Sequence, residues 1–245
     1  MVFARKHLAE CGSTNTEALA HLRDGGGPLL VSASRQTAGR GRLGRAWLTE
    51  QAGDDAALTF SIALPLPAAL DLSGLSLAVG CTVADVLDPA GRRIQLKWPN
   101  DLFLDGAKLG GILIETVPLP ADQRGVVIGI GLNLRPLPEG ADREAFASGH
   151  AALQTLDPAA TAAATLDRLA PALRGMLADF ETLGFAPWQA AFARRDLAGG
   201  QRVRVGEQAG TARGVSERGE LLLETAAGLL PCSGGELSLR LEKPL

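Results

Sequence analysis

The strongest constraint on the fold is a change in the pattern of the chain at Gly199-Gly200. After this point, five short strand-like stretches follow one another within about 45 residues, separated by turns rich in glycine or polar residues. Closely spaced short strands are typical of a small barrel or sandwich. The sequence therefore predicts a larger domain over residues 1–198 and a small β-domain over residues 199–245.

The larger segment predicts a mixture of strands and helices. Strand-like stretches lie at 29–33, 57–64, 94–98, 107–115 and 126–134, and helical spacing of apolar residues occurs at 16–23, 71–88, 161–183 and 187–195. Ser13-Thr14-Asn15 precedes the first helix, and a small hydroxyl residue followed by Glu17 indicates a capped N-terminus. Asp105-Gly106 between two strand-like stretches indicates a two-residue hairpin turn. Because most strands precede the longer helices, we expect an α+β domain with a mixed or antiparallel sheet.

Composition and charge exclude several classes of protein. The net charge is −3, from 24 Lys+Arg against 27 Asp+Glu, whereas nucleic-acid-binding proteins are usually clearly basic. No apolar run approaches the roughly 18 residues of a membrane-spanning helix, and the N-terminus lacks the apolar stretch of a secretory signal. We therefore expect a cytoplasmic protein that does not bind membranes. The three cysteines and three histidines are widely spaced, which predicts neither a disulfide framework nor a Cys/His metal site.

The most informative stretch is rich in glycine and arginine. Residues 35–45 contain four arginines and three glycines. Glycine lets the backbone approach a ligand with its N–H groups pointing inward, and arginine provides planar donors for phosphate or carboxylate oxygens. The stretch therefore predicts a site for a phosphate beside a carboxylate. A flexible basic surface loop and an RNA-binding tract are the alternatives.

Lysine is scarce, with four residues against twenty arginines, so a lysine within a distinctive motif is notable. Lys97 lies in Lys97-Trp98-Pro99-Asn100-Asp101 at a strand end, and Lys108 begins an otherwise uncharged strand. Asn133 is a polar residue in an apolar strand. Each also has a structural alternative: Lys108 as an ordinary edge lysine, Asn100 and Asp101 as turn caps, and Asn133 as a hydrogen-bonded core amide.

Five motifs in this order resemble the ordered motifs of biotin protein ligases, also called biotin–[acetyl-CoA-carboxylase] ligases. They are Ser13-Thr14-Asn15, Gln36 to Trp47, Lys97 to Asp101, Lys108 to Leu113, and Gly129 to Asn133. The C-terminal stretch Ser233 to Arg240 is similar to the end of their SH3-like domain. The resemblance covers nearly the whole chain. It implies an α+β fold: a mixed-sheet catalytic domain of the biotin/lipoate ligase type, followed by a small C-terminal SH3-like β-barrel.

The resemblance implies an ATP-dependent ligase that works in two steps. The biotin carboxylate attacks the α-phosphate of ATP, giving biotinyl-5′-AMP and pyrophosphate. A lysine of a biotin carboxyl carrier protein, as in acetyl-CoA carboxylase, then attacks the mixed anhydride, giving an amide and AMP. Biotin and ATP are the substrates, and Mg²⁺ with protein cations would offset the repulsion between the two anions.

The resemblance also implies roles for single residues. The catalytic candidates are Lys108 and Arg42, which would stabilise adenylate formation, and Asp101, which would orient or deprotonate the acceptor lysine. Biotin binding is expected from Ser13, Thr14, Asn15, Gln36, Gly39, Arg40, Gly41, Arg42, Lys108, Gly111, Gly129 and Gly131. ATP or adenylate binding is expected from Arg40, Arg42, Arg45, Trp47, Asn100, Lys108 and Asn133. Asn133 resembles the asparagine near the triphosphate and the metal, and Trp47 would either cover the intermediate or pack the loop.

The chain departs from the family pattern in two places. After Trp47 the family often has a Ser-Pro-type segment, whereas residues 48–55 here are different, so the exit of the loop is rebuilt or an insertion lies beside the site. Some members carry an N-terminal helix-turn-helix that binds DNA. The Ser-Thr-Asn motif begins here at residue 13, so we expect no such domain and no operator binding. A homodimer could form through exposed sheet edges.

Two other functions remain as alternatives. A lipoate ligase or octanoyltransferase would share the fold, but the octanoyltransferase would need a nucleophilic cysteine. Cys81 lies in an apolar helical pattern and Cys11 precedes the Ser-Thr-Asn motif, so neither suits that role. An RNA-associating protein is disfavoured by the negative net charge.

Overall fold

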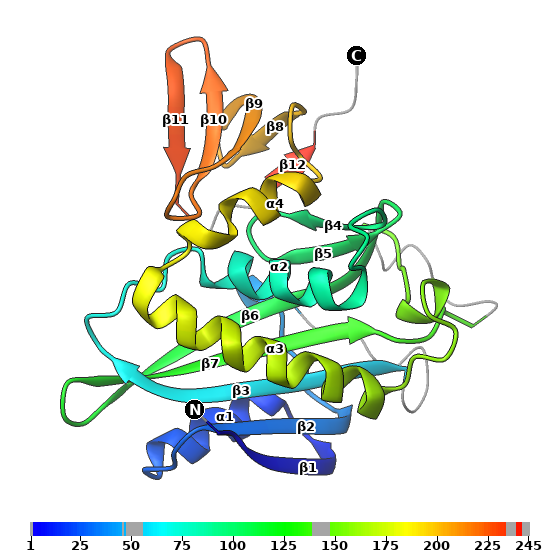
Figure 1. Cartoon of the computed structure of the whole chain (residues 1–245), viewed down its shortest axis with the longest axis vertical. Coiled ribbons are helices and arrows are strands. Elements are labelled where there is room, and N and C mark those ends of the chain that lie inside the picture. The colour runs from blue at the N-terminus through cyan, green and yellow to red at the C-terminus, as the bar shows by residue number, and fades with distance from the viewer. Residues whose placement is uncertain (1, 46, 48–55, 139–147, 234–238, 242–245) are drawn as a thin grey trace. The chain divides into compact units, whose positions relative to one another are not determined.

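The computed structural model describes residues 2–45, 47, 56–138, 148–233 and 239–241 (Figure 1). The chain forms two compact units: residues 1–70 with 106–174 make unit 1, and residues 71–105 with 175–245 make unit 2. No described helix is both long enough and apolar enough to cross a membrane.

Unit 1 contains a five-stranded portion of sheet in the order β1-β2-β3-β7-β6. The strands are β1 (Ala4–Cys11), β2 (Leu29–Gln36), β3 (Ala57–Pro67), β6 (Ala107–Leu119) and β7 (Gln123–Asn133). β1 pairs with β2 in parallel, and the other neighbours are antiparallel. The predicted mixed sheet of an α+β domain is therefore confirmed. The sequence analysis missed β1, because its side chains are mostly exposed on both faces and show no apolar alternation.

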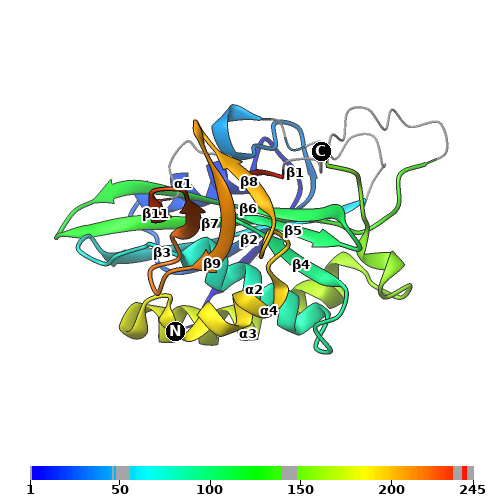
Figure 2. The same ribbon diagram turned by 90° about the horizontal axis from the view of Figure 1, so that it is seen from above.

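Helix α1 (Thr14–Arg23) covers one face of this sheet. It shares a buried core of Ala18, Leu19, Leu22, Leu29, Val31, Ala63, Val117 and Val127. Alternate residues of β2, such as Leu30 and Ser32, point to the other face, where the first half of α3 (Ala162–Leu183) lies. Figures 1 and 2 show α1 and this half of α3 on opposite sides of the sheet.

The start of α1 corrects the expectation that a small hydroxyl residue caps the helix. Ser13 occupies the N-cap position with extended backbone angles, but its side chain makes no capping hydrogen bond. Instead, the backbone N–H of Thr14 donates to Oε1 of Gln36 over 2.7 Å. Gln36 ends β2 and lies opposite Cys11, so the tertiary structure supplies the acceptor for this first helix donor, which has no partner within the helix.

Unit 2 holds α2 (Leu75–Leu87), α4 (Gln189–Arg195), two short strands and the C-terminal strands. Helix α2 precedes the antiparallel pair β4 (Ile94–Lys97) and β5 (Asp101–Leu104). Asp105 and Gly106, which follow β5, both have positive φ, 51° and 80°, as a two-residue hairpin turn requires. After α4, a five-stranded antiparallel sheet has the order β11-β10-β9-β8-β12.

The five C-terminal strands agree with the small β-domain predicted from the spacing of turns. Their bounds are β8 (Arg202–Val205), β9 (Gln208–Val215), β10 (Leu221–Thr225), β11 (Gly228–Cys232) and β12 (Leu239–Leu241). Val203, Val205, Ala212, Leu221 and Leu223 are buried on one side of this sheet.

Candidate functional site

Two glycines of β7 form the floor of a polar site beyond the N-terminus of α1. A Cβ atom added to Gly129 would lie 2.2 Å from Oδ1 of Asn15. One added to Gly131 would lie 2.7 Å from the indole ring of Trp47. Gly111 of β6 lies opposite Gly131 in the strand register. An amide and an aromatic ring can therefore rest directly on the sheet backbone only because these positions carry no side chain.

A buried hydrogen-bond network forms the wall next to this floor. The Ser61 hydroxyl lies 2.7 Å from Oγ1 of Thr14 and 2.6 Å from Oδ1 of Asn15. The Thr14 hydroxyl donates in turn to Oε1 of Gln36 over 3.1 Å. All four side chains are at most 8% exposed. The structure thus brings together Thr14, Asn15 and Gln36, and it adds Ser61, which the sequence analysis missed although it is a polar residue in the apolar strand β3.

Glu115 of β6 joins this network to the Gly/Arg loop. Nδ2 of Asn15 donates to Oε2 of Glu115 over 2.8 Å and approaches Leu113 O at 3.3 Å. Nη2 of Arg40 lies 3.2 Å and 3.1 Å from the two Glu115 oxygens, and Nη1 donates to Oγ1 of Thr16 over 2.9 Å. Sequence reasoning missed Glu115, and the signal that could have found it is a single charge ending an apolar strand.

The Gly/Arg loop folds back on itself. Trp47 N donates to Gly39 O over 2.9 Å, and Gly41 N donates to Arg45 O over 2.7 Å. A single 3₁₀ turn spans Arg42–Gly44. Arg40 and Arg45 are exposed and Arg42 is half-buried, while Nε1 of Trp47 is buried with no hydrogen-bond partner among the described residues. The unusual segment 48–55 lies outside the described residues, as does the tail segment 234–238.

Lys108 and Asn133 meet at the other end of the floor. The backbone of Lys108 donates to Ser148 O over 3.1 Å and accepts from Ala151 N over 2.8 Å. Nδ2 of Asn133 lies 3.2 Å from Lys108 O and 3.1 Å from Ala151 O. The Asn133 amide therefore fixes the start of β6, where the half-buried Lys108 side chain begins. Its nitrogen behaves as the hydrogen-bonded core amide that the sequence analysis kept as an alternative.

Asn100 and Asp101 belong to unit 2, in the hairpin between β4 and β5. Asp101 lies opposite Lys97 in the register, and the ammonium of Lys97 lies 5.7 Å from the centre of the Phe103 ring. The buried Trp98 donates from Nε1 to Gly219 O over 3.0 Å. Within this unit, the Lys-Trp-Pro-Asn-Asp motif is therefore held to the C-terminal β-sheet by its tryptophan.

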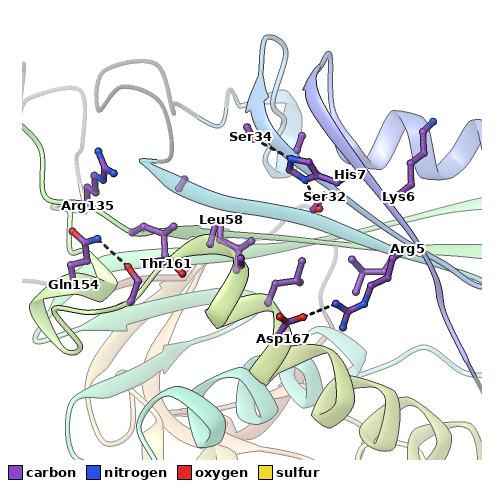
Figure 3. Close-up of a pocket in the computed structure, with 18 residues that line it drawn as sticks. Arg5, Lys6, His7, Ser32, Ser34, Leu58, Arg135, Gln154, Thr161 and Asp167 are labelled. Atoms are coloured by element: carbon purple, nitrogen blue, oxygen red, sulfur yellow. Dashed lines mark hydrogen bonds and ion pairs between the residues drawn. The ribbon is translucent and has the colours of Figure 1, made fainter.

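A cavity of about 600 Å³ opens in unit 1 between β2 and the start of α3 (Figure 3). None of the predicted site residues lines it. Its polar groups contact one another: Arg5 pairs with Asp167 at 2.6 Å, and the His7 ring lies 3.0 Å from the Ser32 hydroxyl and 3.2 Å from that of Ser34 (Figure 3). The residues predicted to bind biotin and ATP therefore lie outside the lining of this cavity.

The cysteines do not suit nucleophilic catalysis. Burial, helped by the nearby Asp85, raises the pKa of Cys81 to about 12, so its thiol stays protonated at neutral pH. Burial and then Glu17 also raise the pKa of Cys11. All three cysteines are free thiols. Within the part of the chain that the structure describes, no group of three or more His, Cys, Asp or Glu residues could hold a metal ion.

Two families match the chain. The Biotin/lipoate A/B protein ligase family matches residues 12–133, which include the floor glycines, the polar network and the Gly/Arg loop. The Biotin protein ligase C terminal domain matches residues 198–240.

Named relatives and solved structures agree with these matches. A biotin–[acetyl-CoA-carboxylase] ligase of Paracoccus denitrificans is 34% identical over 90% of this chain and 94% of its own length. The bifunctional ligase/repressor BirA of Escherichia coli K12 is 36% identical over 85% of this chain and 65% of its own length. The biotin protein ligase of Aquifex aeolicus in complex with biotin and ATP has a TM-score of 0.79 at 28% identity, covering 97% of this chain and 99% of that chain.

Proposed function

The chain belongs to the biotin protein ligase family, and from this premise we propose that it is a biotin–[acetyl-CoA-carboxylase] ligase. It activates biotin with ATP as biotinyl-5′-AMP and transfers the biotinyl group to a lysine of a biotin carboxyl carrier protein. The observation that carries the proposal is the buried network of Thr14, Asn15 and Gln36 beside the glycine floor of β7, where the family motifs converge.

The network has the chemistry that a small polar ring requires. Hydroxyl and carboxamide groups both donate and accept hydrogen bonds, so they can match the carbonyl and the two N–H groups of a cyclic urea. Ser13, Thr14, Asn15 and Gln36 are all at most 8% exposed, so little side-chain freedom remains to be lost on binding. Gly129 lets the Asn15 amide lie directly on the sheet backbone, which places this amide in the wall of the proposed site.

Adenylate formation requires positive charge where two anions meet. The biotin carboxylate approaches the α-phosphate of ATP, and their repulsion limits the attack. Arg42 and Arg45 of the Gly/Arg loop would meet the phosphates, and the backbone N–H group of Gly39 would meet the carboxylate. Lys108 would lie at the junction and stabilise the charge that develops during attack.

Magnesium would accompany ATP. The Asn133 nitrogen donates to Lys108 O and Ala151 O. The carboxamide oxygen would therefore be the atom of Asn133 that serves as a ligand for a hard cation. Mg²⁺ usually keeps several water ligands and also binds substrate phosphates, so a single protein oxygen is enough to complete its coordination. When bound, the ion would neutralise phosphate charge near Lys108.

For the transfer step, the acting groups are residues of unit 2 and the lysine of the acceptor protein. We propose that Asp101 orients or deprotonates the acceptor lysine, with Asn100 beside the nucleotide. Residues 1–198 are proposed as the catalytic domain and residues 199–245 as the C-terminal SH3-like domain, which the family match to residues 198–240 supports. A homodimer remains a prediction, supported by the exposed edge strand β1.

The decisive test is exchange of labelled pyrophosphate into ATP. Biotin-dependent exchange by the purified chain is expected, because adenylate formation is reversible. Exchange with lipoate and none with biotin would favour a lipoate ligase instead. Transfer is checked separately, by mass spectrometry of a biotin carboxyl carrier domain whose acceptor lysine gains the biotinyl group and whose Lys→Arg variant does not.

A methyl group on the floor should weaken biotin binding. Gly129→Ala would place Cβ 2.2 Å from Oδ1 of Asn15, so the amide must leave its place beside Ser61. We expect the KM for biotin to rise at least tenfold, equivalent to about 1.4 kcal/mol. Gly27→Ala is the control, because nothing lies within 4 Å of its added Cβ atom. An unchanged KM in a folded Gly129→Ala protein would remove Asn15 from the biotin site.

A further inference from the structure

We propose that Glu115 is a positioning residue for the reaction, and that its partner Arg40 anchors the Gly/Arg loop instead of binding phosphate through its guanidinium. The inference rests on the proposed function, because it concerns the wall of the proposed biotin site. It follows from the contacts that converge on one carboxylate.

The first contact fixes the orientation of Asn15. A carboxamide nitrogen has two protons, and here they point to Oε2 of Glu115 at 2.8 Å and to Leu113 O at 3.3 Å. Both acceptors belong to β6, so the nitrogen side of the amide faces that strand. The oxygen side therefore faces Ser61, at 2.6 Å. Glu115 thereby presets which end of the Asn15 amide is offered to a ligand.

The second contact ties the Gly/Arg loop to the sheet. Arg40 directly follows Gly39, whose backbone N–H group is the proposed contact of the biotin carboxylate. Its guanidinium lies 3.1 Å and 3.2 Å from the two Glu115 oxygens and donates to Thr16 on α1 at 2.9 Å. With these partners satisfied, the Arg40 side chain holds the loop backbone in place.

Charge makes the two residues interdependent. Glu115 is 29% exposed and Arg40 41% exposed, so solvent screens their pairing only partly. If Arg40 is removed, a half-buried carboxylate is left unpaired beside a site for anionic substrates, and like charges repel. If both charges are removed, that repulsion disappears, although the contact between Arg40 and Glu115 that ties the loop to the sheet (the tether) is also lost. Arg40→Gln should therefore be worse alone than in combination with Glu115→Gln.

A double-mutant cycle tests the proposal through biotin-dependent pyrophosphate exchange. For Glu115→Gln we expect the KM for biotin to rise about fivefold with kcat changed less than about twofold, and for Arg40→Gln a rise of more than about tenfold. The double variant should recover to the level of Glu115→Gln. Multiplicative effects, or a fall of kcat in Arg40→Gln at unchanged KM, would mean that Arg40 binds the phosphates itself and would overturn the proposal.

Trypsin cleavage gives a readout that needs no activity. Loss of the tether should speed cleavage after Arg42 and Arg45 in Glu115→Gln by at least about threefold over the wild-type chain. Glu10→Gln is the matched control, because it breaks the exposed ion pair with Arg35 on neighbouring strands of the same unit. Equal cleavage in all three proteins would refute the tether. Absence of any exchange by the wild-type chain, together with faster cleavage of Glu115→Gln, would overturn the proposed function and leave the tether standing.

Discussion

Replacing Lys108 by alanine is expected to slow formation of biotinyl-5′-AMP by about 10²- to 10³-fold in a single turnover at saturating biotin and ATP. A preorganised cation at the point of charge development typically contributes about 3–4 kcal/mol to a transition state. The effect should fall mainly on the rate and less on substrate affinity, because the stabilised charge grows during the attack.

Rapid quench with labelled ATP measures this step directly. Lys6→Ala is a suitable control, since Lys6 is an exposed lysine of the same unit that pairs with Glu17. Lys108→Arg keeps the charge but changes the shape of the donor, so it should restore only part of the rate. An adenylation rate in Lys108→Ala equal to that of Lys6→Ala would remove Lys108 from the catalytic group.

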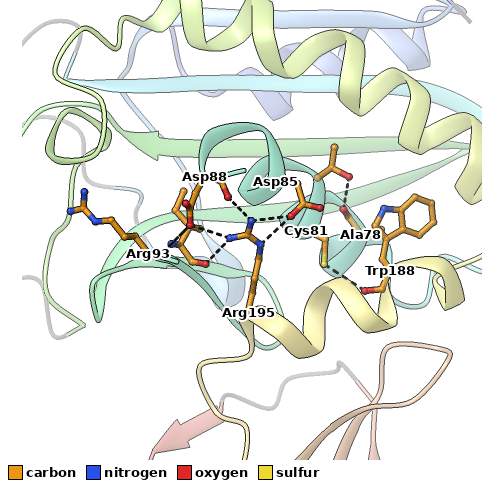
Figure 4. A network of polar contacts seen from close by, with 9 residues as sticks. Ala78, Cys81, Asp85, Asp88, Arg93, Trp188 and Arg195 are labelled. Atoms are coloured by element: carbon orange, nitrogen blue, oxygen red, sulfur yellow. Dashed lines mark hydrogen bonds and ion pairs between the residues drawn. The ribbon is translucent and has the colours of Figure 1, made fainter. Parts of the chain in front are cut away.

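Replacing Arg195 by methionine is expected to lower the free energy of unfolding by about 3–5 kcal/mol, because one partner of a buried ion pair would remain without its counter-charge. Arg195 ends α4, and its side chain is 4% exposed. Its guanidinium lies 3.0 Å from Asp85 Oδ1 and 3.3 Å from Asp88 Oδ2, and it also donates to Asp88 O and Ile94 O (Figure 4). One side chain thus joins α2, β4 and α4 within unit 2.

Urea denaturation followed by circular dichroism measures this loss. Arg194→Met provides the matched control, because Arg194 is the neighbouring exposed arginine and its replacement should change the free energy of unfolding by less than about 0.5 kcal/mol. Equal unfolding midpoints for the two variants would show that the buried network contributes little to stability.

The same network predicts a dependence of stability on pH. Burial raises the pKa of Asp88, but the backbone N–H groups of Ile94 and Arg93 and the Arg195 guanidinium outweigh it, so the pKa is lower than usual. The stabilisation is complete above the unfolded-state pKa, about 3.9, and is lost as the pH falls through the lower folded-state value. Asp88→Asn should therefore flatten the acid limb of a stability curve measured from pH 6 to pH 2.5. If the free energy of unfolding of Asp88→Asn falls with decreasing pH as steeply as that of the wild-type chain, other carboxylates cause the loss of stability in acid.

Much of the fold could be predicted from local pattern. The apolar period and turn signals identified α1, the strands β2, β3, β6 and β7, and the five C-terminal strands, because side-chain period and turn chemistry are local properties. The same reasoning missed β1, whose exposed side chains carry no alternation, and it predicted a hydroxyl cap for α1, where instead Gln36 accepts from the Thr14 N–H. Both errors arise where a distant segment supplies the partner.

For the site, the chemical groups could be predicted from the motifs, whereas their arrangement follows from the folded chain. Motif order identified the amide, hydroxyl, arginine and lysine residues, and the composition of the chain left few competing functions. Only the strand register placed Gly129 against Asn15, and only the folded chain joined Glu115 to Arg40, which is 75 positions away in sequence. A side chain's hydrogen-bonding capacity is a property of the residue, but its partner depends on which strands pair, and that is fixed by burial of the whole sheet.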